Sequence, residues 1–471
     1  MPNSIVVGML WGDEGKAKIL DELVQEAKED NNQKVWVVRF QGGPNAGHTM
    51  CVRKDDELVK FVTHAAPSGL TSNSEIAIGP HTAFDTEKFM KELNEARELF
   101  NYDAGIHISE RVGILFDYHR IIDGLQEAKR KNKVGTTKSG IGPFYMDNAN
   151  RATRITFADY VGDNFHDKLK EVLKQKNKDL EEAKSLIPEF EDYSLSNYIE
   201  KLIAVHNPIR EELKEFVCRL EYRLREALEN GENIIGEGAQ GTMLHVNMGT
   251  IPDVSSSHLL APEGLASLGL PRRAFKIYGI EKIYPTRVGN GFMPTLAEDE
   301  FGVETQKNSG EAGATTGRKR RVGYPDWVIS KYAAMLNDLD GIYLTRADCV
   351  QDKDLKVCTA YEIDGQEIAE VPLKLEIAKP FYSDKTYRWH LWDGTKDLSD
   401  PLKADKELAE KRKSLVEAGR DGLPEGLREF VENHDEYVRV PTIGVSIGPA
   451  RGETIKLYKK YRPLIQREEF V

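Results

Sequence analysis

Short apolar segments that end in a glycine-rich loop recur along the chain, and this pattern constrains the fold more than any other feature. In "SIVVGMLWGDEGK", a predicted strand over residues 3–8 runs into a loop before a predicted helix over 15–30. The same order recurs in "VWVVRFQGGPNAGHT", "ENIIGEGAQGT", "GIYLTRAD" and "TIGVSIGP". Continuous apolar strands that alternate with helices indicate a parallel sheet covered on both faces. We therefore predict an α/β fold with a large central, mostly parallel sheet flanked by helices.

The chain has 471 residues, which exceeds a typical single domain but suits a large α/β enzyme built around one sheet. It contains no tandem repeat and no low-complexity linker. Residues 159–230 are dense in lysine, glutamate and leucine at helical spacing, which predicts a charged helical segment. We therefore predict a single domain over residues 1–471 that includes this segment.

The composition argues against several classes of partner. A net charge of −12 disfavours binding to nucleic acid or to an anionic membrane, so an anionic substrate needs local basic clusters. The four cysteines lack metal-binding spacing and indicate reduced thiols. The sequence has no signal-peptide pattern and no apolar run of about 18 residues. We expect a cytoplasmic protein.

The first glycine-rich loop has the features of a phosphate site but differs from the standard P-loop. Gly12 and Gly15 let backbone amides approach an anion, and Lys16 adds a positive charge at the start of a helix. Ala17 stands where the standard P-loop carries a serine or threonine for the metal. Asp13 is therefore expected to ligate a divalent cation or to act as a general base.

Two further loops carry groups that suit phosphate chemistry. "GGPNAGHT" places Asn45, Gly47 and His48 after a strand, where an imidazolium can neutralise a phosphoryl group during transfer. "GTTKSGIGP" offers Thr137 as a donor to phosphate, with Arg151 nearby. A structural histidine and a plain surface turn are the alternatives for these two loops.

The remaining loops suit recognition of a base and of a small acid. Gln240 carries an amide that can both donate to and accept from a base edge. "GATTGRKRR" sets Arg318 and Arg320 beside threonines, and two guanidinium groups suit a dicarboxylate. Asp348 ends "LTRAD" and can accept two hydrogen bonds from guanine, which would select guanine over adenine.

Taken in order, these loops resemble the motifs of the adenylosuccinate synthetase family. The matching segments run from residue 5 to 455 and are "WGDEGK", "VRFQGGPNAGHT", "GTTKSGIGP", "GEGAQGTML", "TRVGNGFMPT", "GATTGRKRR", "LTRAD" and "VSIGPARGETI". The resemblance implies a homodimeric ligase of purine biosynthesis that joins L-aspartate to IMP with GTP and Mg²⁺. It implies that Asp13 takes the N1 proton, that O6 attacks the γ-phosphate, and that aspartate displaces phosphate from 6-phosphoryl-IMP.

The resemblance also implies roles for individual residues, which we group by ligand. The catalytic group is Asp13, His48, Lys16 and Gln240. GTP binding is implied for Gly12, Gly15, Lys16, Gly47, Thr49, Arg346, Asp348, Ser446 and Gly448. IMP binding is implied for Asp13, Asn45, Thr137, Gln240, Ser255, Val288 and, from the partner subunit, Arg151. L-Aspartate is assigned to Thr315, Thr316, Arg318 and Arg320, and Mg²⁺ to Asp13 and the Gly47 carbonyl.

The chain departs from the usual family motifs near the purine nucleotide and GTP sites, whereas the aspartate loop is intact. The departures include Ala17, Lys138, Ser139, His245, Asn247, Ser255, Arg346, Ile447 and Ala450. Residues 384–435 form an extended C-terminal insertion with the aromatic patch "YRWHLW", which suits local packing or a dimer-edge insertion.

Alternative functions follow from these departures. A branch of the family acts on dGMP and typically replaces the loop aspartate with a small residue that makes room for the 2-amino group. The retained Asp13 therefore favours IMP, with dGMP or another purine nucleotide as the alternative. A catalytically inactive nucleotide-binding regulator is a further hypothesis, and the presence of both Asp13 and His48 argues against it.

Overall fold

The computed structural model describes residues 2–30, 33–54, 57–131, 136–187, 190–311, 317–393 and 406–457. Eleven strands form its main sheet, in the order β18-β17-β13-β10-β1-β9-β2-β5-β6-β8, with β7 paired to β5. Their bounds are β1 (Asn3–Gly8), β2 (Val35–Gly42), β5 (Glu75–Phe84), β6 (Ile106–Ser109), β7 (Gly113–Ile114), β8 (Val217–Cys218), β9 (Asn233–Glu237), β10 (Phe275–Lys282), β13 (Gly341–Thr345), β17 (Thr442–Ser446) and β18 (Thr454–Lys456).

The pairings in this sheet are parallel apart from that of β17 with β18. The predicted large and mostly parallel central sheet is therefore confirmed. Its first strand is central, because β1 lies between β9 and β10, which come much later in the chain. The loop that follows β1 consequently meets loops from distant parts of the sequence.

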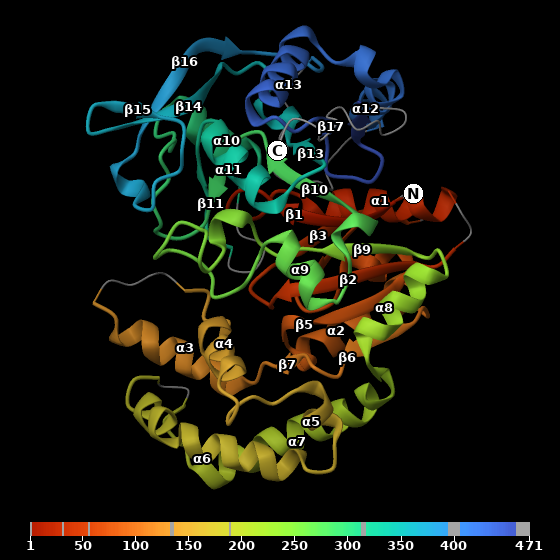
Figure 1. Cartoon of the computed structure of the whole chain (residues 1–471), viewed down its shortest axis with the longest axis vertical. Helices are drawn as coiled ribbons and strands as arrows, with labels where there is room; N and C mark the ends of the chain where they lie inside the picture. Colours follow the sequence, from red (N-terminus) through yellow and green to blue (C-terminus); the bar gives the residue numbers. More distant parts are fainter. Residues whose placement is uncertain are drawn as a thin grey trace.

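Helices cover the sheet and extend beyond both of its ends (Figure 1). In Figure 1, α5, α6 and α7 lie at one end of the molecule, and α12 and α13 lie at the other. The helix bounds are α1 (Lys16–Asp30), α2 (Thr86–Phe100), α3 (Asp117–Lys129), α4 (Ile141–Ala149), α5 (Phe157–Val161), α6 (Phe165–Lys184), α7 (Leu195–Leu213), α8 (Leu220–Glu229), α9 (Ala261–Ser267), α10 (Glu300–Asn308), α11 (Trp327–Asn337), α12 (Lys406–Ala418) and α13 (Glu425–Val438).

Three smaller sheets complete the strands of the described residues. They are the antiparallel pairs β3 (His48–Lys54) with β4 (Glu57–Thr63) and β11 (Thr286–Arg287) with β12 (Arg321–Val322), and the three-stranded sheet of β14 (Leu355–Ile363), β15 (Gln366–Ile368) and β16 (Lys379–Tyr387). The charged stretch 159–230 holds α6, α7 and α8. The same stretch also holds β8, a two-residue strand at the edge of the main sheet. The lysine- and glutamate-rich sequence of the stretch does not predict this strand.

The helix after the first loop is fixed to the sheet by one apolar face. Ile19, Leu20, Leu23 and Val24 are buried, at the spacing that puts them on one side of α1. They share a core cluster with residues from β1, β2, β9 and β10, namely Val6, Val35, Val37, Ile235, Tyr278 and Ile280. Because this face is rigidly packed, the loop before α1 has a fixed position above the sheet edge.

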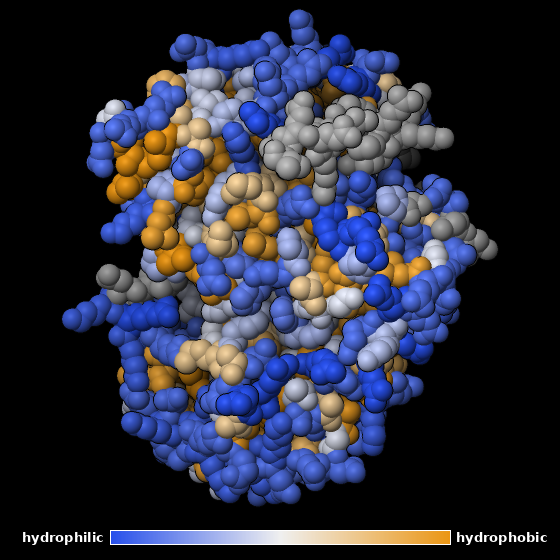
Figure 2. Space-filling model, viewed as in Figure 1, coloured by the Kyte–Doolittle hydropathy of each residue, from blue (hydrophilic) through white to orange (hydrophobic). Residues whose placement is uncertain are grey.

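The surface agrees with the high share of charged residues, which is 30% of the chain. The face in Figure 2 is mostly hydrophilic, with hydrophobic patches at its upper left and smaller ones across its middle and lower parts. Within the described part of the chain, no helix combines the length and the apolar character needed to cross a membrane.

Candidate active site

A cavity of about 1060 Å³ lies where the carboxyl ends of six neighbouring strands meet. These strands are β17, β13, β10, β1, β9 and β2, and each contributes its last residues or its following loop to the cavity wall. Ligands in open α/β sheets bind at this edge, so the cavity is the candidate active site.

Most of the predicted site residues that the structure describes line this cavity. They are Gly12, Asp13, Gly15, Lys16, Asn45, Gly47, His48, Thr49, Thr137, Gln240, Ser255, Val288, Arg318, Arg320, Arg346, Ser446 and Gly448. The cavity wall carries more basic than acidic side chains, which suits anionic ligands despite the acidic net charge of the chain.

Two predicted residues that the structure describes stand apart from the cavity wall. Asp348 is buried behind it, and Arg151 is exposed in the turn after α4. Thr315 and Thr316 lie outside the described residues, so the structure neither supports nor opposes their assignment to L-aspartate.

The second acid of the first loop, Glu14, holds the loop in shape. Its Oε1 accepts hydrogen bonds from the backbone N–H groups of Leu10 (2.8 Å) and Gly12 (2.9 Å). Its Oε2 lies 3.3 Å from Lys16 Nζ. The pKa of Glu14 lies above its ordinary value, because burial raises it by more than Lys16 and the two amides lower it. A carboxylate inside this loop therefore organises its backbone and anchors Lys16 in the cavity wall.

Asp13, the other acid, points into the cavity. Its backbone is in the left-handed region, with φ of 60°, as are those of Gln240 (58°) and Arg346 (67°). Residues other than glycine adopt this backbone conformation mainly at turns and functional sites. Asp13 Oδ2 accepts a hydrogen bond of 2.9 Å from Arg320 Nε, and the Asp13 side chain is 27% exposed. The predicted base therefore contacts a residue that the sequence assigns to the amino acid.

A fully buried carboxylate, Glu311, connects three basic residues of the cavity. Lys282 Nζ lies 3.1 Å from both of its oxygens, Arg320 donates at 2.7 Å, and Arg346 donates at 3.4 Å. The Tyr284 hydroxyl donates a further hydrogen bond of 2.7 Å. Burial raises the pKa of Glu311, but the surrounding cations outweigh it and hold that pKa below its ordinary value. Burial lowers the pKa of Lys282 to about 8, so the pair is ionised at neutral pH.

His48 is held by a second buried carboxylate, Glu237 at the end of β9. His48 Nδ1 contacts Glu237 Oε1, while Glu237 Oε2 accepts hydrogen bonds from the Ser68 N–H (2.7 Å) and hydroxyl (2.8 Å). Burial raises the pKa of Glu237, but His48 and Arg39 lower it further than burial raises it. Glu237 is thus an acceptor, so Nδ1 of His48 carries a proton and Nε2 faces the cavity.

Five buried polar atoms of the cavity wall have no hydrogen-bond partner within the described ranges, and three of them lie in the loops after β2 and β9. These three are Asn45 Oδ1, His48 Nε2 and Gln240 Oε1. Buried polar groups in folded proteins are nearly always paired, and an orphan costs about 1–3 kcal/mol. Three such groups from two loops around one cavity therefore indicate a polar ligand that supplies their partners.

The residues assigned to the GTP base lie at the end of β13 and after β17. Lys18 joins α1 to this region, because its Nζ donates to Ser446 Oγ (2.5 Å), Gly448 O (2.8 Å) and Glu453 O (2.9 Å). Ser446, Gly448 and Arg346 line the cavity, whereas the Asp348 carboxylate faces a buried arginine.

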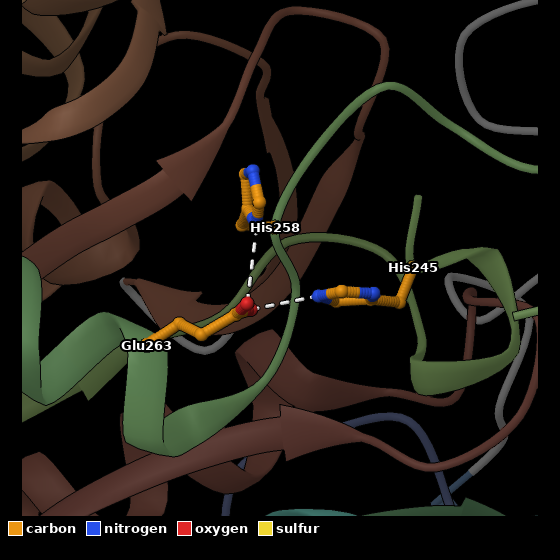
Figure 3. A group of neighbouring side chains, drawn as sticks. All are labelled: His245, His258 and Glu263. Carbon is orange, nitrogen blue, oxygen red and sulfur yellow. Dashed lines mark hydrogen bonds and ion pairs between the residues drawn. The ribbon is translucent and has the colours of Figure 1, made fainter. Parts of the chain in front are cut away.

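The segment that carries Ser255 is braced by His245, His258 and Glu263 (Figure 3). In Figure 3 the two imidazoles approach the Glu263 carboxylate from different sides, with distances of 2.7 Å to His245 Nε2 and 3.1 Å to His258 Nδ1. The grouping has metal-like spacing. However, His245 Nδ1 accepts backbone N–H groups at 3.1 Å from Asn247 and Met248, so its Nε2 carries the proton. The cluster is therefore a hydrogen-bonded brace.

Several residues that shape the site have no role in the sequence-based assignment. They are Glu14, Lys18, Glu237, Lys282 and Glu311. Glu237 could have been found, because it precedes Gln240 in the glycine-rich motif at the end of a predicted strand. Lys282 and Glu311 carry no such signal, because their pairing across 29 residues depends on the fold.

Replacing Glu311 with glutamine should destabilise the fold at pH 7 by about 3–5 kcal/mol, because it leaves buried cations without a counter-charge. The pKa of Glu311 is lower in the folded than in the unfolded chain. Its stabilisation is thus complete above about pH 4.5, the ordinary value, and declines as the pH falls below it. The difference in urea midpoint between wild type and Glu311→Gln should therefore be smaller at pH 4 than at pH 7.

Glu304→Gln is the matched control, because Glu304 is half exposed and pairs with Lys353 on the surface. Exposed pairs contribute little, so its urea midpoint should equal that of wild type. An equal midpoint for Glu311→Gln and wild type at pH 7 would contradict the account of Glu311.

Comparisons with known proteins agree with this geometry. Residues 5–455 match the protein-family model described as adenylosuccinate synthetase. Adenylosuccinate synthetase of Alkaliphilus metalliredigens is 35% identical over 465 residues, covering 97% of this chain and 99% of that protein.

Two solved structures are similar in fold. Fully ligated adenylosuccinate synthetase of Plasmodium falciparum superposes with a TM-score of 0.80 at 26% identity, covering 97% of this chain and 100% of that one. Succinoaminodeoxyadenylate synthetase of cyanophage S-2L, bound to dGMP and dATP, gives a TM-score of 0.57 at 17% identity over 97% and 96% of the two chains, and shows the fold alone. On the family match and the identity to its relatives, the chain belongs to the adenylosuccinate synthetase family.

Proposed function

We propose that this enzyme joins L-aspartate to IMP at the expense of GTP, giving adenylosuccinate, GDP and phosphate. The observation that supports this most is the convergence of Asn45, His48 and Gln240 beside Asp13, with three orphan polar atoms in one basic cavity. The two amide oxygens can accept from a purine N1–H and from an ammonium group, and His48 Nε2 can donate to a phosphoryl group once the imidazole is protonated. An inactive nucleotide-binding regulator needs neither Asp13 nor His48.

In the first step, the Asp13 carboxylate takes the proton from N1 of IMP. The electron pair shifts to O6, O6 attacks the γ-phosphorus of GTP, and GDP leaves with the electrons of the broken bond. Burial lowers the pKa of His48, and the Glu237 carboxylate on Nδ1 opposes that shift. The negative charge of the bound phosphates favours the imidazolium further, and protonated His48 donates from Nε2 to the transferring phosphoryl group. Lys16 adds positive charge, and Gln240 holds the base near O6.

In the second step, the amino group of L-aspartate attacks C6 of 6-phosphoryl-IMP. The C6–O6 bond breaks, so phosphate leaves with the original O6, and the amine loses a proton. Arg318 and Arg320, with Thr315 and Thr316, are assigned to the L-aspartate carboxylates. Arg320 contacts Asp13 in this structure, so a carboxylate of incoming L-aspartate competes with Asp13 for Arg320. Binding of the amino acid therefore frees Asp13 to act as the base.

Mg²⁺ fits the oxygen-rich edge of the first two loops. Asp13 Oδ2 is occupied by Arg320, but the carboxylate is partly exposed in the cavity, and Gly47 contributes to the same wall. Carboxylate and carbonyl oxygens are the ligands that Mg²⁺ prefers. Asp13 and the Gly47 carbonyl would hold the ion, which would neutralise charge on the GTP phosphates.

The remaining contacts follow the ligands along the cavity. Thr137, Ser255 and Val288 are assigned to IMP, with Arg151 from the partner subunit of a homodimer. The exposure of Arg151 outside the cavity suits donation to a second copy. Gly12, Gly15 and Thr49 are assigned to the GTP phosphates, and Asp348, Arg346, Ser446 and Gly448 to guanine. A cytoplasmic location stays a prediction.

A panel of purine monophosphates tests the substrate assignment. With L-aspartate, GTP and Mg²⁺, IMP should give the absorbance rise of an N6-substituted purine, and dGMP and GMP should turn over at least about 100-fold more slowly. The reason is that the 2-amino group of guanine would clash with the Asp13 side chain, so these nucleotides cannot bind in the reactive position. Turnover of dGMP without turnover of IMP would overturn the assignment and favour the 2-aminoadenylosuccinate reaction.

Replacement of Asp13 tests its role as the base. Asp13→Ala should lower kcat by about 10²–10⁴, the usual contribution of a general base. Its affinity for GTP, measured by calorimetry without IMP, should stay within about tenfold, because most phosphate contacts come from other residues. The melting temperature serves as the folding control. A fully active Asp13→Ala variant would refute the proposed base.

A further inference from the structure

The aromatic patch of the C-terminal insertion packs behind the proposed guanine subsite. Trp389 Nε1 donates a 3.0 Å hydrogen bond to the carbonyl of Ala347, the residue before Asp348. Gln351 Oε1 accepts the backbone N–H groups of Leu391 (3.0 Å) and Trp392 (3.2 Å). The insertion therefore braces the turn that carries Asp348.

Arg412 of α12 reaches the same turn from the other side of the insertion. The side chain is 2% exposed, and its Nη2 lies 3.2 Å from Asp348 Oδ2. Its Nη1 lies 3.4 Å from both oxygens of Glu453, and its guanidinium sits 5.5 Å from the ring centre of Trp392. Arg412 thus forms a buried ion pair with each of two acids and a cation–π contact with the aromatic patch.

Arg412 also supports the second strand end of the subsite. A Cβ atom at Gly448 would lie 2.7 Å from Arg412 Cζ and 2.7 Å from Arg412 Nε, so the guanidinium packs directly on this glycine. Arg412 Nε has no hydrogen-bond partner among the described residues. One arginine therefore fixes both Asp348 and Gly448, which the proposed function assigns to the same base.

The charge of Asp348 makes this support necessary. A buried carboxylate without a counter-charge is costly, and it either turns toward another donor or takes up a proton. The second oxygen, Oδ1, accepts only a weak 3.8 Å contact from Cys349 Sγ, so a carboxylate fixed through Oδ2 by Arg412 keeps lone pairs on Oδ1 for a ligand. Guanine presents N1–H and a 2-amino group on one edge, which suits such an acceptor.

We propose that Arg412 is a specificity-determining positioning residue for the nucleobase of the triphosphate. It orients the Asp348 carboxylate toward N1–H and the 2-amino group of guanine, and it holds Gly448 against the base. This inference rests on the proposed assignment of Asp348 to guanine. It gives the C-terminal insertion a role as the rear wall of the GTP site.

Kinetics with GTP and ITP test the inference, because ITP lacks only the 2-amino group. Arg412→Met should lower kcat/KM for GTP by about 10–100-fold, the effect of losing a hydrogen bond to a charged group, through a higher KM for GTP. The preference for GTP over ITP should shrink to near 1, while KM for IMP and L-aspartate stays unchanged. A purely structural role would lower activity with both nucleotides equally.

Lys413→Met is the matched control, since Lys413 is the next residue of α12 and its side chain is 76% exposed. It should keep the GTP preference of wild type. If Arg412→Met does not fold, Arg412→Lys replaces it. A lysine cannot span Asp348 and Glu453 together, so the preference should still fall several-fold.

Asp348→Asn separates the two levels of the proposal. If Asp348→Asn keeps the full preference for GTP over ITP, the guanine assignment itself is wrong. If Asp348→Asn loses the preference while a folded Arg412→Met, or Arg412→Lys in its place, retains it, the assignment stands and the role of Arg412 is refuted. Loss of the preference in both variants supports the inference.

Discussion

The buried carboxylate of Glu311 is the interaction on which the geometry of the cavity depends. It gathers Lys282 from β10, Arg346 from the end of β13 and Arg320 from the segment before β12 around one negative charge. These cations belong to different strand ends and would repel one another without it. Through Arg320, the same charge reaches Asp13, so the arrangement of the proposed base depends on a residue that contacts no substrate in our proposal.

The site therefore has two layers of charge. Side chains that face the cavity, such as Asp13 and His48, are positioned by buried acids behind them, Glu311 and Glu237. At the far end, Asp348 and Arg412 form a further buried ion pair, which lies behind Arg346, Ser446 and Gly448 of the cavity wall. Each buried partner limits the orientation of the group in front of it, which is the preorganisation that catalysis and selective binding require.

The sequence predicts the front layer well and the rear layer poorly. Glycine-rich loops at strand ends are recognisable because backbone approach and helix starts need particular residues, and parallel strands bring such loops to one edge. Lys282, Glu311 and Arg412 sit in ordinary surroundings in the sequence, and only the fold brings them to their partners. The sequence predicts that a strand ends on Asp348, whereas β13 ends at Thr345 and Asp348 lies in the 3-10 helix Ala347–Val350. Its burial against Arg412, 64 residues away, follows from packing of the insertion.

In the proposed reaction, O6 of IMP is phosphorylated before nitrogen replaces it. Turnover of IMP labelled with ¹⁸O at position 6, followed by mass spectrometry of the released phosphate, tests this directly. The account predicts one ¹⁸O atom in each phosphate formed, because O6 leaves with the phosphoryl group. Unlabelled phosphate, with the ¹⁸O released into water, would mean that GTP is hydrolysed separately and would contradict the proposed chemistry of Asp13 and His48.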